Sequence, residues 1–460
     1  GARAVRVRIL LHDFHSTGRN AVVMRLAFEP NVEMRMFNPL AGSRSSFFGR
    51  MINALDDAKT LQQRMHNKLF VADNTMGITG GRNLGDAYFG VGTDANFVDV
   101  DVLAAGSIVK DLSRSFDDYW NNERAYPVQS LVTREELDKI REQARRAQSE
   151  EEEAAKAKPA PPDDTPMDLR KAHFVWAPAV VFVDKPGKVP LSANGSRAGG
   201  DAPAQPGLVV RGSSAAATQE AVSSADDDSV VDGLLSVFER AHSELNIVSP
   251  YFVPGADMKK ALAAAVARGV KVRVLTNSLS SNDAVAAHAG YARHREELLR
   301  MGVELYEMRS DPAAAGIGID SAGVLGSSGG RPPTGGSMGG GSTGGGSTPG
   351  GSRAMLHSKL LTIDGRLIVI GSMNLDLRSQ LQNTEIALVI RSPELSRIAN
   401  ERIEEGFRSG AWRVEIADGQ LHWRAPAGSG LNDTTTEPQT TLGQRMMVRI
   451  IGPLAPDRLL

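Results

Sequence analysis

The chain of 460 residues contains no cysteine. This absence excludes disulfide bonds, a thiolate nucleophile and a zinc site built on cysteine. It leaves the redox compartment open, because proteins on either side of a membrane can lack cysteine. Any covalent chemistry must therefore use another nucleophilic side chain.

The sequence also lacks a charge excess and a long apolar run. Its formal net charge of −2 excludes the global positive field of a non-specific nucleic-acid binder but allows a local basic pocket. It contains no run of 18 apolar residues, so it predicts no membrane-spanning helix. With 41 % hydrophobic and 23 % charged residues the composition is that of a soluble globular protein. The length indicates two domains or one duplicated domain.

An internal repeat favours the duplicated domain. ARAVRVRIL (residues 2–10) matches ARGVKVRVL (residues 267–275), and a helix-like segment follows each. A second predicted strand comes next, at 31–37 in the first copy and 302–308 in the second. This alternation of strand, helix and strand predicts an α/β fold with mostly parallel sheets.

Comparison of the copies divides the chain into three parts. We expect a first half at 1–133 and a second half at 229–460, which carries a Gly/Ser-rich insertion at 321–353. Between them, 134–228 is a charged and low-complexity linker with a strand-like island at 172–184.

The start of the chain differs from the start of the second copy. Residues 230–255 read as a helix followed by a strand, and the first copy has no counterpart to them. A duplicated fold should carry both, so we expect about 30 to 40 further residues, with any leader or anchor, ahead of Gly1.

Two polar stretches repeat with identical spacing. HNKLFVADNTMGITGGRN begins at His66, and HSKLLTIDGRLIVIGSMN begins at His357. Each has Lys two residues on, then Asp, Gly and Asn at matching positions. The matched residues are Lys68, Asp73, Gly80 and Asn83 in the first copy and Lys359, Asp364, Gly371 and Asn374 in the second.

These residue types suit a phosphodiester. In each stretch His and Lys lie on the same face of a predicted strand, and buried Lys requires an anion. One stretch alone is more typical of a core strand, but two brought together place two imidazoles, two ammonium groups and two carboxamides in one pocket. The Lys and Asn side chains would hold phosphate oxygens, while one His attacks phosphorus and the other protonates the leaving oxygen. The two Lys supply the positive charge, so we expect no metal and no cofactor.

A nucleophilic His also needs a carboxylate on its second ring nitrogen. Glu385 follows His357 by 28 residues and Asp99 follows His66 by 33, which makes them the candidates, with Asp101 as an alternative to Asp99. The motif residues Asp73 and Asp364 precede turn sequences, so a structural role is expected for them. Four other histidines, His12, His15, His288 and His294, could suggest a metal site, but no paired carboxylates stand at ligand spacing, so such a site is disfavoured.

The two stretches resemble the duplicated His-x-Lys-x4-Asp-x6-Gly-Gly/Ser-x-Asn motif of the phospholipase D superfamily. This resemblance implies paired α/β/α halves with the active site at their pseudo-twofold interface, and a phosphohistidine intermediate formed without metal. It implies His66 as nucleophile and His357 as general acid, then base; the near-symmetry leaves the exchanged assignment open. One departure is Gly81, where many members carry Ser, as Ser372 does in the second copy. We expect both positions to border the substrate phosphate, with one hydroxyl donor missing at Gly81.

Further stretches are similar to bacterial cardiolipin synthases, most of all to their type C branch. They are GDAYFGVG (85–92), FDDYWN (116–121), SPYFVPG (249–255), HAGYARHREELLRMGVELYE (288–307) and the C-terminal EP…LGQRMMVRIIGPLAPDRLL. The resemblance implies a phosphatidyltransferase that makes cardiolipin from phosphatidylglycerol and a second phospholipid, with phosphatidylethanolamine as a candidate.

Three alternatives stay open. A phospholipase D-type hydrolase would share every residue named above and differ only in using water as the acceptor. A nucleic-acid phosphodiesterase is disfavoured by the net charge, and no nucleic acid is expected as a partner. A non-catalytic membrane-binding protein is disfavoured by the intact His and Lys pairs. Lipid substrates imply a bacterial cell membrane, with peripheral attachment, through SPYFVPG and nearby aromatic residues, or an anchor in a missing N-terminal segment.

Overall fold

The computed structural model describes most of the two predicted halves. The described residues are 5–12, 26–39, 63–90, 95–131, 138, 142, 146, 168–170, 172–190, 204–212, 227–311, 353–454 and 456–457. Three predicted features lie largely or wholly outside them: the helix-like segment of the first copy, the charged part of the linker and the Gly/Ser-rich insertion. Within the described residues, no helix is long and apolar enough to cross a membrane.

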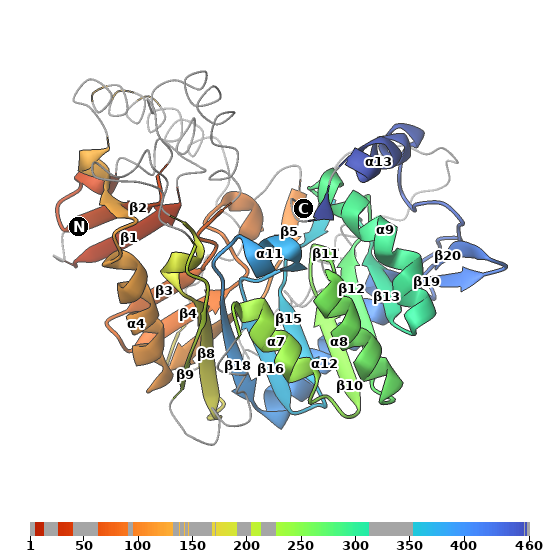
Figure 1. The fold of residues 1–460 in the computed structure, drawn as a ribbon, viewed down its shortest axis with the longest axis horizontal. Helices are drawn as coiled ribbons and strands as arrows, with labels where there is room; N and C mark the ends of the chain where they lie inside the picture. The colour runs from red at the N-terminus through yellow and green to blue at the C-terminus, as the bar shows by residue number, and fades with distance from the viewer. Residues whose placement is uncertain are drawn as a thin grey trace.

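A ten-stranded sheet forms the centre of the molecule (Figure 1). Its strands, in spatial order, are β20 (Gln420–Arg424), β19 (Ala411–Ala417), β13 (Glu304–Met308), β12 (Lys271–Asn277), β10 (Glu244–Val248), β15 (Leu360–Ile363), β16 (Leu367–Gly371), β18 (Ile386–Arg391), β8 (Ala179–Asp184) and β9 (Leu208–Gly212). Strand β8 lies in the predicted strand-like island and pairs with β18. The division of the chain into two halves and a linker remains a prediction.

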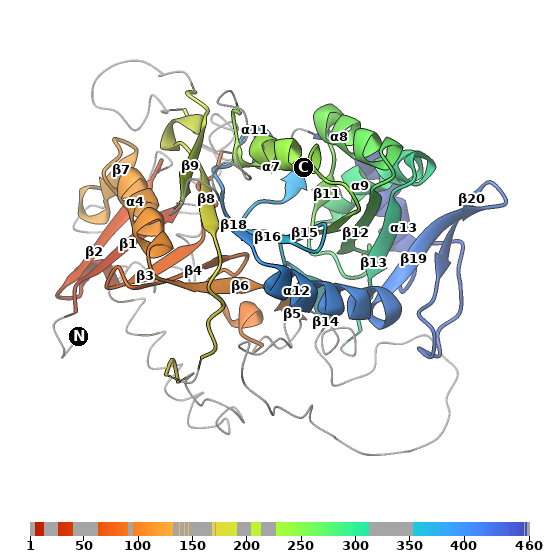
Figure 2. The ribbon, with the colours of Figure 1, turned by 90° about the horizontal axis from the view of Figure 1, so that it is seen from below.

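Alternate residues of the sheet face two separate cores, as the period of a strand requires. In β8, Val180 and Phe182 belong to one buried cluster, and Val181 and Val183 belong to the other. Figure 2 shows helices on both faces of the sheet. The first cluster includes residues of α7 (Val230–Phe238), α8 (Ala256–Ala267) and α9 (Val285–Met301), and the second includes residues of α4 (Ile108–Trp120) and α12 (Pro393–Glu405).

Smaller strand groups complete the described fold. The first half contributes β1 (Val7–His12), β2 (Val32–Phe37) and β7 (Ala125–Pro127), and separately β3 (Leu69–Ala72), β4 (Met76–Gly80) and β6 (Asp101–Ala105). Two pairs are β5 (Ala95–Val98) with β14 (Arg353–Leu356), and β11 (Phe252–Val253) with β17 (Leu375–Asp376). Short helical segments are η3 (Leu26–Phe28), η4 (Asp86–Tyr88), η5 (Val128–Ser130), η6 (Pro186–Lys188), α11 (Leu377–Leu381), the π-helical η8 (Gly406–Gly410) and, near the C-terminus, α13 (Leu442–Leu454).

The limits of the long helices follow from local sequence. Ser229 caps α7 by accepting a hydrogen bond from the Asp232 amide, and Ser392 caps α12 in the same way through the Leu395 amide. Pro393 then stands in the first turn of α12, where its missing N–H costs nothing. Helix α9 ends at Gly302, whose φ of 99° favours glycine.

The α/β class is confirmed, but the strands are not mostly parallel. The repeated strands pair in parallel as predicted: β1 with β2, and β12 with β10 and β13. The motif strands instead form antiparallel hairpins, β3–β4 and β15–β16. Their turns hold Asp73, Asn74, Asp364 and Gly365 at positive φ, and such short turns allow only antiparallel neighbours.

Candidate active site

The two motifs occupy equivalent places in the two hairpins. His66 and Lys68 directly precede β3, while His357 and Lys359 connect β14 to β15. The motif glycines Gly80 and Gly371 end the second strand of each hairpin. A Cβ atom would lie 2.2 Å from Asp101 Oδ1 at Gly80 and 2.4 Å from the Ile386 carbonyl at Gly371. Both positions therefore require glycine for close contact between strands.

Each motif histidine binds the carboxylate that follows the other motif. His66 Nδ1 lies 2.9 Å from Glu385 Oε2, and His357 Nδ1 lies 2.7 Å from Asp99 Oδ2. Both candidate carboxylates therefore contact a motif histidine, and each contacts the histidine of the other motif rather than the one that it follows in sequence. The alternative candidate Asp101 instead binds Arg82, with Nε 2.7 Å from Oδ2.

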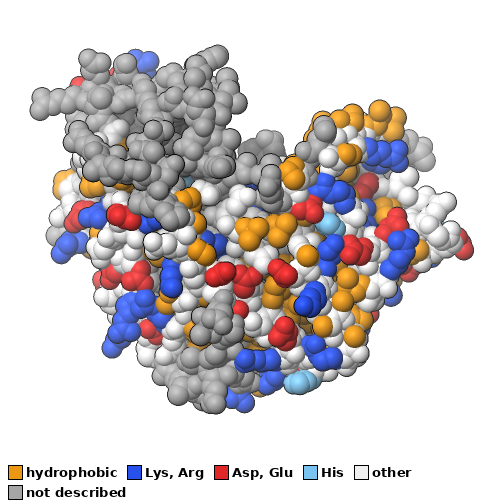
Figure 3. All heavy atoms as spheres, viewed as in Figure 1, with side chains coloured by type: hydrophobic (Ala, Val, Ile, Leu, Met, Phe, Trp, Pro, Cys, Tyr) orange, Lys and Arg blue, Asp and Glu red, His pale blue; other side chains and the backbone are white. Residues whose placement is uncertain are grey.

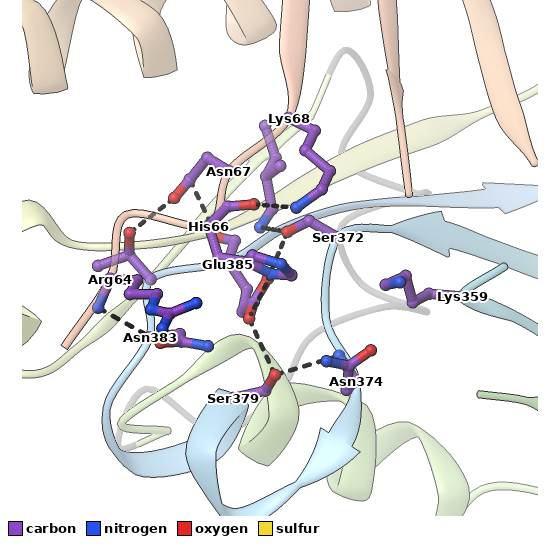
Figure 4. Close-up of polar contacts among 12 residues, drawn as sticks. Arg64, His66, Asn67, Lys68, Lys359, Ser372, Asn374, Ser379, Asn383 and Glu385 are labelled. Atoms are coloured by element: carbon purple, nitrogen blue, oxygen red, sulfur yellow. Dashed lines mark hydrogen bonds and ion pairs between the residues drawn. The ribbon is translucent and has the colours of Figure 1, made fainter. Parts of the chain in front are cut away.

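The backbone explains this exchange. The amide of His66 donates to the carbonyl of Thr384 over 2.9 Å, and the amide of His357 donates to the carbonyl of Val98 over 2.8 Å. Each histidine is thus hydrogen-bonded to the residue just before its carboxylate. The pairing of β14 with β5 and a bridge between Met65 and Thr384 join the same segments. Figure 4 shows His66 and Lys68 beside Glu385 and Ser372, with Lys359 and Asn374 nearby.

Both motif lysines are enclosed in the site. Lys359 is 1 % exposed and donates to the His357 carbonyl, and Lys68 Nζ donates to the His66 carbonyl over 3.0 Å. Burial, followed by repulsion from Lys359, lowers the pKa of Lys68 to about 7. Burial lowers the pKa of Lys359 to about 8, although Asp99 and Glu385 oppose the change. An anion placed between these ammonium groups would relieve both the desolvation and the repulsion.

The imidazoles are neutral in the free site. Burial lowers the pKa of His66 to about 4, against the opposing effect of Glu385. Burial and then the charges of Lys359 and Lys68 lower the pKa of His357 well below its usual value. A neutral imidazole whose Nδ1–H donates to a carboxylate keeps a free electron pair on Nε2. The His66 side chain is 22 % exposed and the His357 side chain 7 %, so His66 is the more accessible ring.

Glu385 is fully buried and held by several donors. Burial alone would raise its pKa, but His66, Lys68 and the Ser372 hydroxyl outweigh burial and lower the pKa to about 2. Ser379 also donates to Oε1 over 2.9 Å. The carboxylate therefore stays ionised and fixes the orientation of His66.

A buried ion pair lies behind Glu385. Asp184, at the end of β8, accepts from the Glu385 amide over 2.8 Å and from Lys188 Nζ over 2.9 Å. Lys188 also donates to the Ser379 carbonyl over 2.9 Å. Sequence analysis did not identify this pair, because its members lie in the predicted linker.

The first motif has Gly81 where the second has Ser372, and each of these residues contacts one of the two carboxylates, Asp99 and Glu385 respectively. A Cβ atom at Gly81 would lie 2.2 Å from Asp99 Oδ1, so this carboxylate occupies the space of a side chain. In the second motif Ser372 donates to Glu385 and accepts from the Ile386 amide over 3.1 Å. Gly81 and Ser372 thus contact the carboxylates in this structure, a contact that the sequence did not predict; their place beside a phosphate remains a prediction.

The two motif asparagines differ in their contacts. Asn83 Nδ2 donates to the Tyr88 hydroxyl over 2.7 Å, whereas Asn374 Oδ1 is buried with no hydrogen-bond partner. The Tyr88 ring stacks on Phe97 with centroids 4.4 Å apart and meets the His357 ring edge-on at 5.1 Å. The sequence did not identify these aromatic contacts of His357, although Tyr88 lies in the GDAYFGVG stretch.

Of the four other candidate histidines, the two in α9 have separate carboxylate partners. His288 Nε2 is 3.3 Å from Glu437 Oε1, and His294 Nε2 is 2.9 Å from Asp457 Oδ2. His12 ends β1, and His15 lies outside the described residues. Over the described part of the chain, no three His, Asp or Glu side chains form a group that could hold a metal ion.

Comparison with known proteins identifies relatives over the full chain. The family described as "Cardiolipin synthase, PLD-like domain" matches residues 234–327 and 345–406. Cardiolipin synthase C of Escherichia coli is 31 % identical over 459 residues, which cover 100 % of this chain and 85 % of that protein. An uncharacterised protein of Helicobacter pylori is 29 % identical over 97 % of this chain and 77 % of its own. The crystal structure of a Haemophilus influenzae phosphatidylserine synthase aligns with a TM-score of 0.49 and 12 % identity over 99 % of this chain and 90 % of that one. The paired motifs and the full-length relationship to cardiolipin synthase C show that this chain belongs to the phospholipase D superfamily, in its cardiolipin synthase-like family.

Proposed function

We propose that this protein is a phosphatidyltransferase that makes cardiolipin from phosphatidylglycerol and a second phospholipid through a phosphohistidine intermediate. The observation that carries the proposal is the pair of exchanged contacts, His66 with Glu385 and His357 with Asp99, beside the partly buried Lys68 and the buried Lys359. This arrangement offers a nucleophile, a second proton carrier and an anion-binding centre at one place.

In the first step, Nε2 of His66 attacks the phosphorus of the donor lipid. The N–P bond forms as the P–O bond to the leaving alcohol breaks, and His357 gives its proton to the departing oxygen. Free His357 is neutral, because burial, Lys359 and Lys68 lower its pKa. A bound phosphodiester anion offsets the charge of the lysines and raises the pKa of His357, so Nε2 of His357 takes up a proton from water before the first step and regains one from the acceptor hydroxyl in the second.

In the second step, a hydroxyl group of phosphatidylglycerol attacks the same phosphorus. His357 accepts the hydroxyl proton, the new P–O bond forms, and the N–P bond to His66 breaks. Lys68, Lys359 and Asn374 hold the non-bridging oxygens in both transition states. The unpartnered Oδ1 of Asn374 is free to accept a hydrogen bond from a substrate hydroxyl, and its Nδ2 to donate to a phosphate oxygen.

The nature of the acceptor rests on the relatives. Cardiolipin synthase C matches the whole of this chain, which favours a lipid alcohol over water. The site suits any phosphodiester, so the lipid substrates and the bacterial membrane as the place of action come to this chain from that relationship.

Product analysis tests the proposal. The purified protein is incubated with labelled phosphatidylglycerol, with and without phosphatidylethanolamine, and the lipids are separated. We expect labelled cardiolipin, and its loss in His66→Ala and His357→Ala variants. Phosphatidic acid as the only product would replace the transferase with a hydrolase, and unchanged turnover in both variants would reject the site.

A further inference from the structure

Helix α13 presents its apolar side to solvent. Its exposed large side chains are Leu442 (66 %), Met446 (53 %), Met447 (49 %) and Ile450 (61 %). They share one side of the helix, because positions 442, 446 and 450 are spaced by four residues. Surface helices of globular proteins usually turn their apolar side inward, so this orientation is the reverse of the common one.

The opposite side of α13 is already occupied. Gly452 is buried, and its carbonyl accepts from Arg293 of α9, which also binds Asp457. Val448 and Ile451 on this side are partly buried. The helix is therefore fixed on the body of the protein with its apolar side outward.

Basic residues flank the apolar stripe. Arg449 is exposed, and Arg445 is partly exposed with its guanidinium donating to the Thr440 carbonyl. Figure 3 shows the hydrophobic side chains over α13 with Lys and Arg side chains next to them. An apolar stripe with arginine beside it is the composition of helices that lie in the interface of an anionic membrane.

The helix also lies on the side of the molecule that carries the candidate site. In Figure 1, α13 lies at the upper right, above and to one side of α11 and β5, which lie at the upper ends of the central strands. These two elements hold Ser379, which binds Glu385, and Val98, which precedes Asp99. Two more exposed apolar side chains lie at that site, Leu84 (94 %) next to Asn83 and Phe89 (57 %) next to Tyr88.

From these observations we infer that α13 is an interfacial helix that docks the protein on an anionic lipid surface through Leu442, Met446, Met447 and Ile450. Docking there turns the site toward the bilayer, so a lipid phosphate reaches His66 without leaving the membrane surface. The choice of a lipid surface as the partner rests on the proposed function.

Vesicle flotation tests this inference with the whole chain. Vesicles of phosphatidylglycerol and phosphatidylcholine are mixed with the wild type or with the double variant Met446→Gln/Ile450→Gln. Because each buried methylene contributes roughly 0.8 kcal/mol, we expect the variant to bind at least about tenfold more weakly. The matched control is Leu169→Gln/Trp176→Gln, which removes two apolar side chains that are 47 % and 80 % exposed elsewhere; its binding should equal that of the wild type.

Site-specific fluorescence gives a second measurement. The chain has no cysteine, so Ile450→Cys and Trp176→Cys each accept one polarity-sensitive label. The label at 450 should shift to shorter wavelength with vesicles, and the label at 176 should not. Arg449→Gln should weaken binding to anionic vesicles about fivefold and leave binding to neutral vesicles unchanged.

Two outcomes would overturn the inference. One is equal vesicle binding by the wild type and the Met446→Gln/Ile450→Gln variant. The other is a dimer of the wild type, seen by sedimentation, that the variant loses, because the stripe would then bind a second copy of the chain. Turnover of detergent-dispersed phosphatidylglycerol should be the same in the wild type and in the Met446→Gln/Ile450→Gln variant. Absence of that turnover in the wild type would reject the proposed function. The vesicle-binding result would still decide whether α13 binds lipid.

Discussion

Among individual side chains, the central finding is that each motif histidine contacts the carboxylate that follows the other motif. Glu385 is the more tightly held of the two, with contacts to His66, Ser372 and Ser379. Asp99 is less favourably placed, since burial raises its pKa to about 6 despite the nearby Lys359. The two histidines are therefore equivalent in sequence but not in environment.

Replacement of Glu385 tests this dependence. Glu385→Gln keeps the size of the side chain but removes the charge that orients and stabilises His66. We expect kcat to fall by about 10²–10⁴-fold, the usual contribution of a general acid–base group. The control is Asp101→Asn, which loses a contact with Arg82 but none with a motif histidine. Equal losses in the two variants would contradict the assignment of Glu385.

The lysines predict a loss of activity at alkaline pH. Their folded-state pKa values of about 7 for Lys68 and about 8 for Lys359 lie below the ordinary value, so rising pH removes the charges that bind phosphate. We expect kcat/KM to fall as the pH rises through about 7 to 8. The fall in kcat should come at higher pH, because the bound anion raises both pKa values.

Lys68→Arg provides the comparison for this pH profile. Arginine stays protonated throughout, so the part of the alkaline fall that belongs to Lys68 should disappear. A kcat/KM that stays level to about pH 10 in the wild type would show that the lysine charges do not limit activity.

Gly81 predicts a different kind of loss. In Gly81→Ala the new Cβ would overlap Asp99 Oδ1, so the carboxylate must move away from His357. We expect lower kcat and a free energy of unfolding lower by about 1–3 kcal/mol. Gly85→Ala is the matched control, because its Cβ would meet Tyr88 at an ordinary 3.6 Å. Normal kcat in Gly81→Ala would mean that the Asp99–His357 contact is dispensable.

Among helices and strands, β8 connects the predicted linker to the site. It ends at Asp184, which receives the Glu385 amide and pairs with Lys188. Lys188→Met removes one partner of a buried ion pair, so we expect the free energy of unfolding to fall by about 3–5 kcal/mol. Urea unfolding measures this change. Arg170→Met, which removes an exposed pair with Asp168, should have no measurable effect, and a similarly stable Lys188→Met would contradict the role given to the pair.

The sequence predicted some of these elements well and others poorly. Two motifs with equal spacing identified His66, Lys68, His357 and Lys359, because chemistry fixes both residue type and spacing. The parallel strands of the repeat followed from their alternation with helices. The antiparallel hairpins were missed, although the turns after Asp73 and Asp364 are too short for a crossover.

The pairing of the carboxylates could not be predicted in the same way. His66 and Glu385 are 319 residues apart in sequence and meet only through tertiary contacts. Similar distances along the chain do not show which of the two histidines each carboxylate contacts. The exposure of the apolar side of α13 could not be predicted either, because an apolar stripe in the sequence does not show whether the protein or a membrane covers it.

For the molecule as a whole, the structure joins two half-sites into one. Backbone hydrogen bonds from His66 to Thr384 and from His357 to Val98 connect the segments that carry the motifs and their carboxylates. The large sheet and its helices support the paired histidines and carboxylates. Helix α13 lies toward the same side of the molecule as this site. The proposed mechanism places the covalent intermediate of this single phosphodiester site on His66.

Trapping that intermediate tests the claim most directly. The protein is mixed with phosphatidylglycerol radiolabelled in its phosphate, quenched in alkaline denaturant to preserve a phosphorus–nitrogen bond, and digested for peptide mapping. If His66 is the nucleophile, the label appears transiently on the peptide that contains His66 and is absent from the His66→Ala variant. Label on the peptide that contains His357, or label that persists in His66→Ala, would contradict it.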